Sequence, residues 1–342
     1  MAGKARKVHT EILTGIRPTG DLTLGNYLGA IKPVIDLQRG ARNGLVFVAD
    51  LHGLTDQEPA TVAAHRYGLV GDLLALGLDT AKTEIFIQSA IRSQVLLLTM
   101  LLSRHETLAE LMRVPALKNK LKDPKRPEQA TFMLANYPVM MAADILLQGS
   151  EYVPVGDDQV AHLEFIRVLI RRFNTRYGEV FTEPKAQPMG KPLRIMALDG
   201  SGKMSKSNPK GAILLSDSAA AVTRKLKRAV TANPGELNDT LRSHFTLARE
   251  LAATGTTAKG EVAAVDRLER RHRAGEKVMG EFKALLGQRI IRFLDGYATA
   301  KQDLAARPEK LRTLVKQGNE TATANANAVI ASVLAATGFK IE

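Results

Sequence analysis

Short apolar runs alternate with longer helical patterns through the first half of the chain. Residues 45–49 (LVFVA) form an unbroken apolar run, which is typical of a strand buried on both faces of a parallel sheet. Similar strands are expected at residues 11–14, 84–88 and 152–155, and helices at residues 65–78 and 94–112. This alternation predicts an α/β fold, a doubly wound parallel sheet whose ligands bind at the carboxyl ends of the strands.

The pattern changes near residue 217, after which only helical periodicity remains. Helices are expected at residues 219–230, 241–253, 261–273, 278–294 and 321–334. Asp217 is the expected N-cap of the first of them. Residues 299–316 are also helical in pattern, but Pro308 should break or kink that helix. The second part of the chain is therefore expected to be an all-helical domain.

The composition limits which partners the protein is expected to bind and which kinds of site it can contain. The formal charge of +13 over 342 residues favours a polyanionic partner, either a nucleic acid or an anionic membrane surface. No apolar run reaches the roughly 18–20 residues of a membrane span, so a cytoplasmic protein with no membrane partner is expected. Residues 1–10 are basic and lack the apolar stretch of a signal peptide, so they are interpreted as a flexible arm. The absence of Cys excludes disulfides and thiolate-held zinc or iron–sulfur clusters.

A lysine-rich loop is the first candidate for chemistry. In the segment GKMSKSNP at residues 202–209, Lys203 and Lys206 flank Ser205, and the glycines of DGSG at residues 199–202 let the loop change shape. Mobile ammonium groups are suited to the charge that develops on a phosphate. Taken alone, such a cluster usually means no more than a solvated turn.

A second segment near the N-terminus has the character of a nucleotide site. TGIRPTG at residues 14–20 leads into TLGN at residues 23–26, with glycines that allow backbone to approach a ligand closely. Tight turns between a strand and a helix would explain the glycines equally well. Thr23 and Asn26 carry donors on short side chains, which suit triphosphate oxygens.

Together the two segments resemble the paired nucleotide-binding motifs of class I aminoacyl-tRNA synthetases, and the TLGN form is similar to that of the tryptophanyl-tRNA synthetases, bacterial type. The resemblance implies a Rossmann-like catalytic domain at residues 11–198, a mobile KMSKS loop at 199–210 and a helical anticodon-binding domain at 211–342, whose last helices can pack back on the catalytic domain. It also implies that ATP and Mg²⁺ are used, with no metal held by the protein itself. The catalytic residues that it implies are Thr23, Asn26, Lys120, Lys203 and Lys206. The ATP-binding residues that it implies are Arg17, Thr19, Gly25, Asn26, Gly156, Asp158, Met204 and Ser205, with Arg17 where relatives often carry Gln.

Asp144 indicates the amino-acid substrate. It lies in YPVMMAADILL at residues 137–147, an expected helix with Pro138 near its first turn. A buried carboxylate needs a donor, and an indole N–H only donates. A tyrosine hydroxyl could also donate, and a structural pair with an Arg or Lys is the plainer alternative. The segment closely resembles the tryptophan-pocket helix of this family. The tryptophan-binding residues that it implies are His52, Tyr137, Met141, Asp144, Val153, Val155 and Gln159.

The resemblance therefore implies a tryptophan–tRNA ligase that forms tryptophanyl-adenylate from ATP and L-tryptophan and charges tRNA(Trp). It also implies a homodimer. The basic side chains expected to contact tRNA are Arg224, Lys225, Lys227 and Arg228. Three alternatives stay open at this point: a tyrosine-specific synthetase, a small-molecule nucleotidyltransferase, and a synthetase-like RNA-binding paralogue that charges no tRNA.

Overall fold

The computed structural model of the chain describes residues 8–114, 117, 129–155, 160–188, 193–253 and 258–339. Its contacts divide the chain into two compact units. Unit 1 consists of Met1–Thr19, Val34–Lys191 and Arg307–Glu342, and unit 2 of Gly20–Pro33 and Pro192–Ala306. The functional boundaries expected at residues 198 and 211 are a different division and stay a prediction. No helix in the described segments combines the length and the apolar character that crossing a membrane requires.

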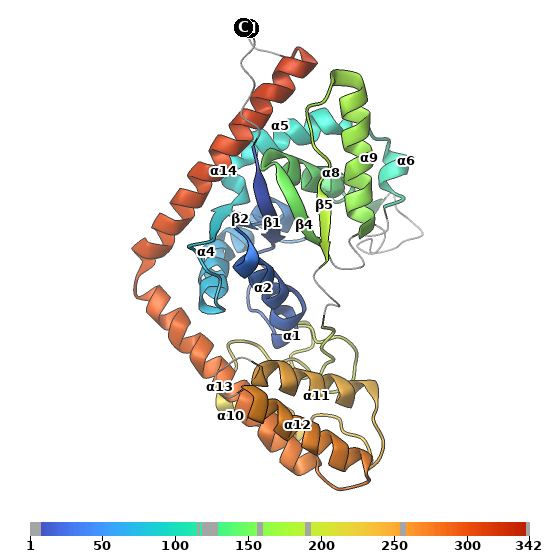
Figure 1. The fold of residues 1–342 in the computed structure, drawn as a ribbon, viewed down its shortest axis with the longest axis vertical. Coiled ribbons are helices and arrows are strands. Elements are labelled where there is room, and N and C mark those ends of the chain that lie inside the picture. Colours follow the sequence, from blue (N-terminus) through green and yellow to red (C-terminus); the bar gives the residue numbers. More distant parts are fainter. Residues whose placement is uncertain are drawn as a thin grey trace. The chain divides into compact units, whose positions relative to one another are not determined.

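Unit 1 is built on a five-stranded parallel sheet in the order β3-β2-β1-β4-β5 (Figure 1). The strands are β1 (Thr10–Ile16), β2 (Gly44–Val48), β3 (Thr83–Ile87), β4 (Ser150–Val155) and β5 (Lys185–Pro188). Every residue of β2 is buried, as its unbroken apolar run predicts. The sheet grows outward from β1 in both directions, so the doubly wound α/β fold is confirmed.

The helices of unit 1 follow the strands along the chain. They are α2 (Lys32–Gly40), which starts in unit 2, α3 (Asp50–Gly53), α4 (Pro59–Ala75), a 3₁₀ turn η2 (Gln88–Ile91), α5 (Arg92–Ser103), α6 (Leu108–Leu111), α8 (Phe132–Leu147), α9 (Val160–Tyr177) and α14 (Pro308–Thr337). The core joins the inner strands to α5, α8, α9 and α14. This core fixes the positions of the strand ends, where the expected ligand residues lie.

Unit 2 contains a short helical turn from the N-terminal part of the chain and a group of longer helices. Its elements are α1 (Leu24–Asn26), a π-helical turn η1 (Tyr27–Ile31), α10 (Ala219–Lys227), α11 (Asp239–Ala252), α12 (Ala258–Arg273) and α13 (Met279–Ala305). The ring of Tyr27 stacks on that of Phe293 with centroids 4.9 Å apart, which ties η1 to α13.

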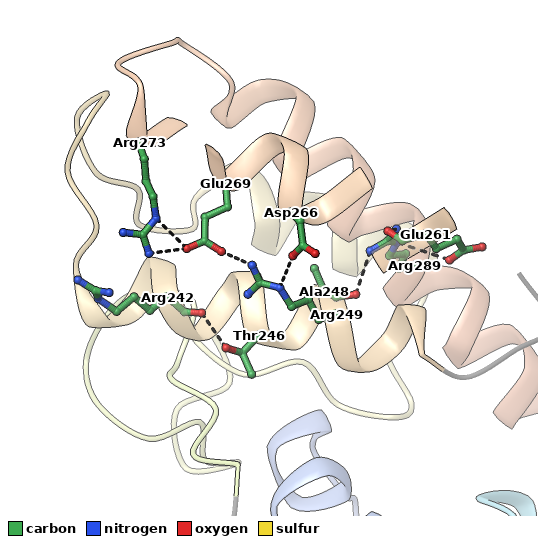
Figure 2. A network of polar contacts seen from close by, with 9 residues as sticks. All are labelled: Arg242, Thr246, Ala248, Arg249, Glu261, Asp266, Glu269, Arg273 and Arg289. Carbon is green, nitrogen blue, oxygen red and sulfur yellow. Dashed lines mark hydrogen bonds and ion pairs between the residues drawn. The ribbon is translucent and has the colours of Figure 1, made fainter. Parts of the chain in front are cut away.

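An ion-pair network joins α11 to α12 (Figure 2). Arg249 on α11 donates to Asp266 and Glu269 on α12, and Glu269 also accepts from Arg273. Arg289 on α13 is buried and donates to the carbonyl oxygens of Ala248 and Glu261. These arginines therefore fasten three helices together, and their charges are already matched inside unit 2.

Several helix boundaries differ from the sequence expectation. The helix expected at residues 94–112 is two helices, because α5 ends at Ser103 and Thr107 then caps α6 in a capping box with Glu110. The expected cap Asp217 is wrong by one residue. Ser218 accepts from the N–H of Ala221, while Asp217 pairs with Lys225 at 2.6 Å.

Two proline expectations had opposite outcomes. The break at Pro308 is confirmed, since α13 ends at Ala305 and α14 begins at Pro308. Pro138 was expected near the first turn of its helix, but it lies inside α8, which already begins at Phe132 because Thr131 accepts from the N–H of Leu134. The strand β5 was not expected, because its sequence KAQP has no apolar run.

The edge strand β3 is covered by α14, which is coloured red beside it in Figure 1. Gly318 allows the approach: a Cβ added there would lie 2.1 Å from the carbonyl oxygen of Ile85. One residue further, Asn319 accepts a hydrogen bond of 2.9 Å from the N–H of Ile87. The helix thus satisfies a backbone donor that a bare sheet edge would expose.

Replacing Gly318 with Ala should lower the free energy of unfolding by about 2 kcal/mol, because the new methyl group meets backbone that cannot move aside. Gly68 on α4 is the matched control, since its added Cβ meets nothing within 4 Å. Gly68→Ala should raise the free energy of unfolding by about 0.5–1 kcal/mol. Urea denaturation of both variants measures the difference, and equal stability of the two would contradict this packing argument.

Candidate functional site

The lysine loop extends from a short hairpin in unit 2. The N–H of Ala197 donates to the carbonyl of Gly202 at 2.8 Å, and the N–H of Met204 donates to that of Ile195 at 2.8 Å. Gly200 and Gly202 take φ values of 74° and 127°, which L residues with side chains rarely adopt. The hairpin turns within these glycines and leaves the side chains of the loop lysines Lys203 and Lys206 exposed.

The two ends of the loop are clasped by polar side chains. The Asn208 amide donates to the Asp199 carboxylate and to the Ser201 hydroxyl, each at 2.8 Å, and Ser201 in turn donates to Asp199 at 2.7 Å. These donors, with Asn208 the strongest, hold the pKa of Asp199 below its usual value. The backbone around the lysines is therefore anchored at both ends by an ionised carboxylate.

Met204 connects the lysine loop to the TLGN segment. Its side chain is buried, and a Cβ added to Gly25 would lie only 3.1 Å from the Cβ of Met204. Beside this contact, the N–H of Leu24 donates to the carbonyl of Ile213 at 2.9 Å. The TLGN segment and the lysine loop are thus packed together within unit 2.

Thr23 and Asn26 bond to each other in a capping box at the start of α1. The N–H of Asn26 donates to the Thr23 hydroxyl, and the Thr23 N–H and hydroxyl both donate to Oδ1 of Asn26, all at 3.0 Å. Thr23 is fully buried, whereas Asn26 is exposed. Because two donors occupy Oδ1, the amide nitrogen Nδ2 is the group of Asn26 that points away from Thr23 as a donor.

Arg17 and Thr19 belong to unit 1, after the carboxyl end of β1. The Arg17 guanidinium reaches both carboxylate oxygens of Asp56, at 2.5 and 2.7 Å. Arg17 stands where relatives often carry Gln. The positive charge that it adds beside β1 is therefore paired with the carboxylate of Asp56. Thr19 is partly buried.

Asp144 lies in unit 1 with its carboxylate almost completely buried, at 3% exposure. The amide Nε2 of Gln88 donates to Oδ1 at 2.9 Å and to Oδ2 at 2.7 Å, and Nε2 of His52 lies 2.9 Å from Oδ2. A carboxylate oxygen accepts, so Nε2 of His52 is the donor in this contact. Among the residues that the structure describes, its partners are a histidine and an amide, and no Arg or Lys of a structural pair takes part.

Other expected pocket residues surround this group. Tyr137, Met141 and Asp144 recur at spacings of four and three, so they share one face of α8. Burial raises the pKa of the Tyr137 hydroxyl, which forms a 2.6 Å hydrogen bond with Nε2 of His162 on α9. Val153 is buried on β4, and the ring of His52 meets that of Tyr137 edge to face with centroids 6.3 Å apart. The structure thus brings His52, Tyr137 and Asp144 together.

Four expected site residues lie outside the described residues: Lys120, Gly156, Asp158 and Gln159. Of Val155, only its backbone in β4 is described.

Three polar residues near the site were missed by the sequence analysis. They are Gln88, His162 and Asp50. Asp50 is buried, pairs with Arg66 at 2.7 Å and accepts from the N–H of Ser89 at 2.9 Å. Gln88 had a usable signal: it follows β3 directly, at the carboxyl end of a parallel strand. The sequence analysis instead placed Gln88 inside the strand expected at residues 84–88.

The expected tRNA-contacting residues of α10 differ in exposure. Arg224, Lys227 and Arg228 are exposed, whereas the Lys225 side chain is only 13% exposed. Its ammonium group pairs with Asp217 and donates to the carbonyl of Ala212 at 2.8 Å. Lys225 therefore stabilises the turn before α10, and the other three form the outward basic surface.

α11 supports the hairpin from which the lysine loop extends. The Ser243 hydroxyl accepts from the N–H of Met196 at 2.8 Å, and its neighbour His244 is 2% exposed. Burial lowers the pKa of His244 to about 4, and the nearby Lys283 ammonium acts in the same direction, against a hydrogen bond with the backbone of Ala197. His244 is therefore neutral in the folded protein at pH 7.

A family model matches the chain over residues 5–295, and its description is "tRNA synthetases class I (W and Y)". The tryptophan–tRNA ligase of Chlamydia caviae is 34% identical over 334 residues, which cover 94% of each chain. The tryptophanyl-tRNA synthetase of Campylobacter jejuni, solved with ADP and tryptophan, superposes with a TM-score of 0.79 at 27% identity, covering 96% of this chain and 100% of that one. The enzyme of Mycoplasma pneumoniae gives the same TM-score at 29% identity, covering 96% and 98%.

His244 should make unit 2 less stable in acid. Its pKa is lower in the folded than in the unfolded chain, so its contribution is complete above about pH 6.5 and is lost as the pH falls through 4. Between pH 7 and pH 5 the free energy of unfolding should fall by about 2 kcal/mol from this group. When the His244→Gln variant is denatured with urea at both pH values, its free energy of unfolding should not show this decrease. The same pH dependence in wild type and variant would assign the effect elsewhere.

Proposed function

Because the chain belongs to the class I tRNA synthetases of the tryptophan and tyrosine type, we propose that it is a tryptophan–tRNA ligase. It activates L-tryptophan with ATP, releases pyrophosphate and transfers the tryptophanyl group to the 3′-terminal adenosine of tRNA(Trp). The observation that carries the activity is the packing of the TLGN segment against the lysine loop through Gly25 and Met204. Similarity to tryptophan–tRNA ligases over almost the whole chain favours tryptophan over tyrosine.

The amino acid is bound in unit 1 by the face of α8 that carries Tyr137, Met141 and Asp144. Asp144 accepts the indole N–H, and His52 borders the pocket. Each oxygen of a carboxylate can accept two hydrogen bonds, and Oδ1 of Asp144 has one partner among the described residues. This spare acceptor supports the assignment of an indole N–H to Asp144. Val153 supplies an apolar wall, and Val155 and Gln159 remain candidates on family resemblance.

ATP is bound with Mg²⁺ on its triphosphate, which neutralises charge as pyrophosphate leaves. Asn26 contacts the triphosphate through Nδ2, and buried Thr23 positions that amide through the capping box. Lys203 and Lys206 stabilise the charge of the transition state from their exposed positions on the clasped loop. Gly25, Met204 and Ser205 shape the same segment. Arg17, Thr19, Gly156, Asp158 and Lys120 are further candidates for the nucleotide.

The partner macromolecule is tRNA, which meets the exposed basic face of α10 with Arg224, Lys227 and Arg228. Residues 211–342 would then hold the anticodon-binding function. A cytoplasmic location suits a tRNA substrate.

The protein assembles as a homodimer, a proposal supported by large apolar side chains left exposed on neighbouring helices of unit 1. They are Leu96, Met100, Leu108 and Phe132, at 54%, 63%, 61% and 75% exposure.

Replacing Lys203 or Lys206 with Ala should lower tryptophan-dependent ATP–pyrophosphate exchange by about 100- to 1,000-fold, because each change removes a positive charge aimed at the developing phosphate charge. Lys210→Ala is the matched control at the end of the same loop, with an exposed side chain, and should retain activity within about twofold. Tyrosine in place of tryptophan should support no comparable exchange. Full activity of both lysine variants, or a preference for tyrosine, would refute the assignment.

Arg224→Glu or Arg228→Glu should weaken tRNA charging at moderate salt by about tenfold, because phosphate contacts dominate such surfaces. Pyrophosphate exchange without tRNA should be unchanged. Arg42→Glu makes the same change of charge at an exposed site before β2, outside residues 211–342, and is the control. A parallel loss of exchange and charging in the arginine variants would indicate damage to the fold rather than to a tRNA surface.

A further inference from the structure

Gln88 is a fully buried amide whose orientation is fixed by the backbone. It follows β3, and its Oε1 accepts from the N–H of Leu51 at 3.0 Å and of His52 at 3.3 Å. Backbone N–H groups only donate, so the oxygen must face them and the nitrogen must face the other way. The assignment of the two ends of this amide therefore follows from chemistry.

The surroundings of Gln88 are held as firmly as the amide itself. Asp50 accepts from the N–H of Ser89 at 2.9 Å and from that of Leu51 at 3.1 Å, and its other oxygen pairs with Arg66. The segments on both sides of the Gln88 amide are thus fastened to one buried carboxylate. This arrangement leaves the direction of Nε2 little freedom.

The nitrogen of Gln88 determines which lone pairs of Asp144 remain available. It donates to both carboxylate oxygens, while His52 meets Oδ2 alone. Among the described residues, Oδ2 therefore has two partners and Oδ1 has one. With the carboxylate held between Gln88 and His52, the remaining acceptor position lies on Oδ1.

We propose that Gln88 is a positioning residue for amino-acid specificity: it holds Asp144 so that Oδ1 accepts the indole N–H of the substrate. This inference rests on the proposed binding of tryptophan by Asp144. Gln88 touches no substrate in this scheme and acts only through the carboxylate. Its loss should therefore affect recognition of the N–H and spare the chemistry of activation.

A substrate pair that differs at the N–H provides the readout. Pyrophosphate exchange is measured with L-tryptophan and with its benzothienyl analogue, in which sulfur replaces the indole N–H. In Gln88→Met, which has similar length but no donor, the kcat/KM ratio of the two substrates should fall by about tenfold, since a hydrogen bond to a charged group loses its geometry. The change should lie in the KM for tryptophan, with the kcat for the analogue unchanged.

Gln148→Met is the matched control. Gln148 is equally buried in unit 1, at the end of α8, where it donates to the carbonyl of Ala322 at 3.2 Å and accepts from Asn325 at 3.1 Å. A loss of general stability would be similar in both variants, but only Gln88→Met should change the substrate ratio. Gln88→Leu is the donorless replacement used if Gln88→Met does not fold. In Gln88→Glu, the carboxyl group would share a proton with Asp144 and so keep a donor, which makes this variant a control that should retain more of the ratio than Gln88→Leu.

Asp144→Asn separates this inference from the proposed function. If Asp144→Asn loses the preference for tryptophan while the donorless Gln88 variants keep it, the role of Gln88 is refuted and that of Asp144 stands. If Asp144→Asn keeps the wild-type ratio, the binding of the indole by Asp144 is refuted, and the inference falls with it. Loss of the preference in Asp144→Asn and in the donorless Gln88 variants, with Gln148→Met unchanged, supports both.

Discussion

A carboxylate buried at the end of a parallel sheet must be met by donors, and the arrangement of unit 1 around Asp144 follows from that constraint. Its donors come from two places far apart in the sequence: His52 on α3 and Gln88 after β3. Neither could reach α8 unless β2 and β3 were neighbours with their carboxyl ends aligned, which is the observed register. The sheet topology and the polar cluster therefore require each other.

Unit 2 holds the positively charged lysine loop in a defined place. The loop lysines stay exposed, while Met204 between them is buried against Gly25. The hydrogen bond from Asn208 to Asp199 then joins the two ends of the loop. The backbone of the loop is thus anchored, while the side chains of both lysines remain exposed.

The arginines and lysines of the chain have two different roles. Arg249 is matched by carboxylates of the next helix and Arg273 by Glu269 within α12, as Figure 2 shows, and Lys225 is matched by Asp217. Such groups stabilise unit 2 and contribute little to its outward field. Arg224 and Arg228 remain exposed on α10, so a net charge read from composition overstates the surface available to a polyanion.

The sequence by itself determined the parallel α/β fold, the helical second half, the break at Pro308 and the family, because apolar periodicity, proline stereochemistry and contiguous motifs are local properties. It also identified Asp144 and His52 as candidates, but it could not show that they bond to each other. Tertiary structure alone decided how deeply Thr23 and Lys225 are buried and that Gln88 faces Asp144. The position of Gln88 depends on hydrogen bonds between residues 37 and 56 positions apart, and periodicity carries no record of such long-range pairing.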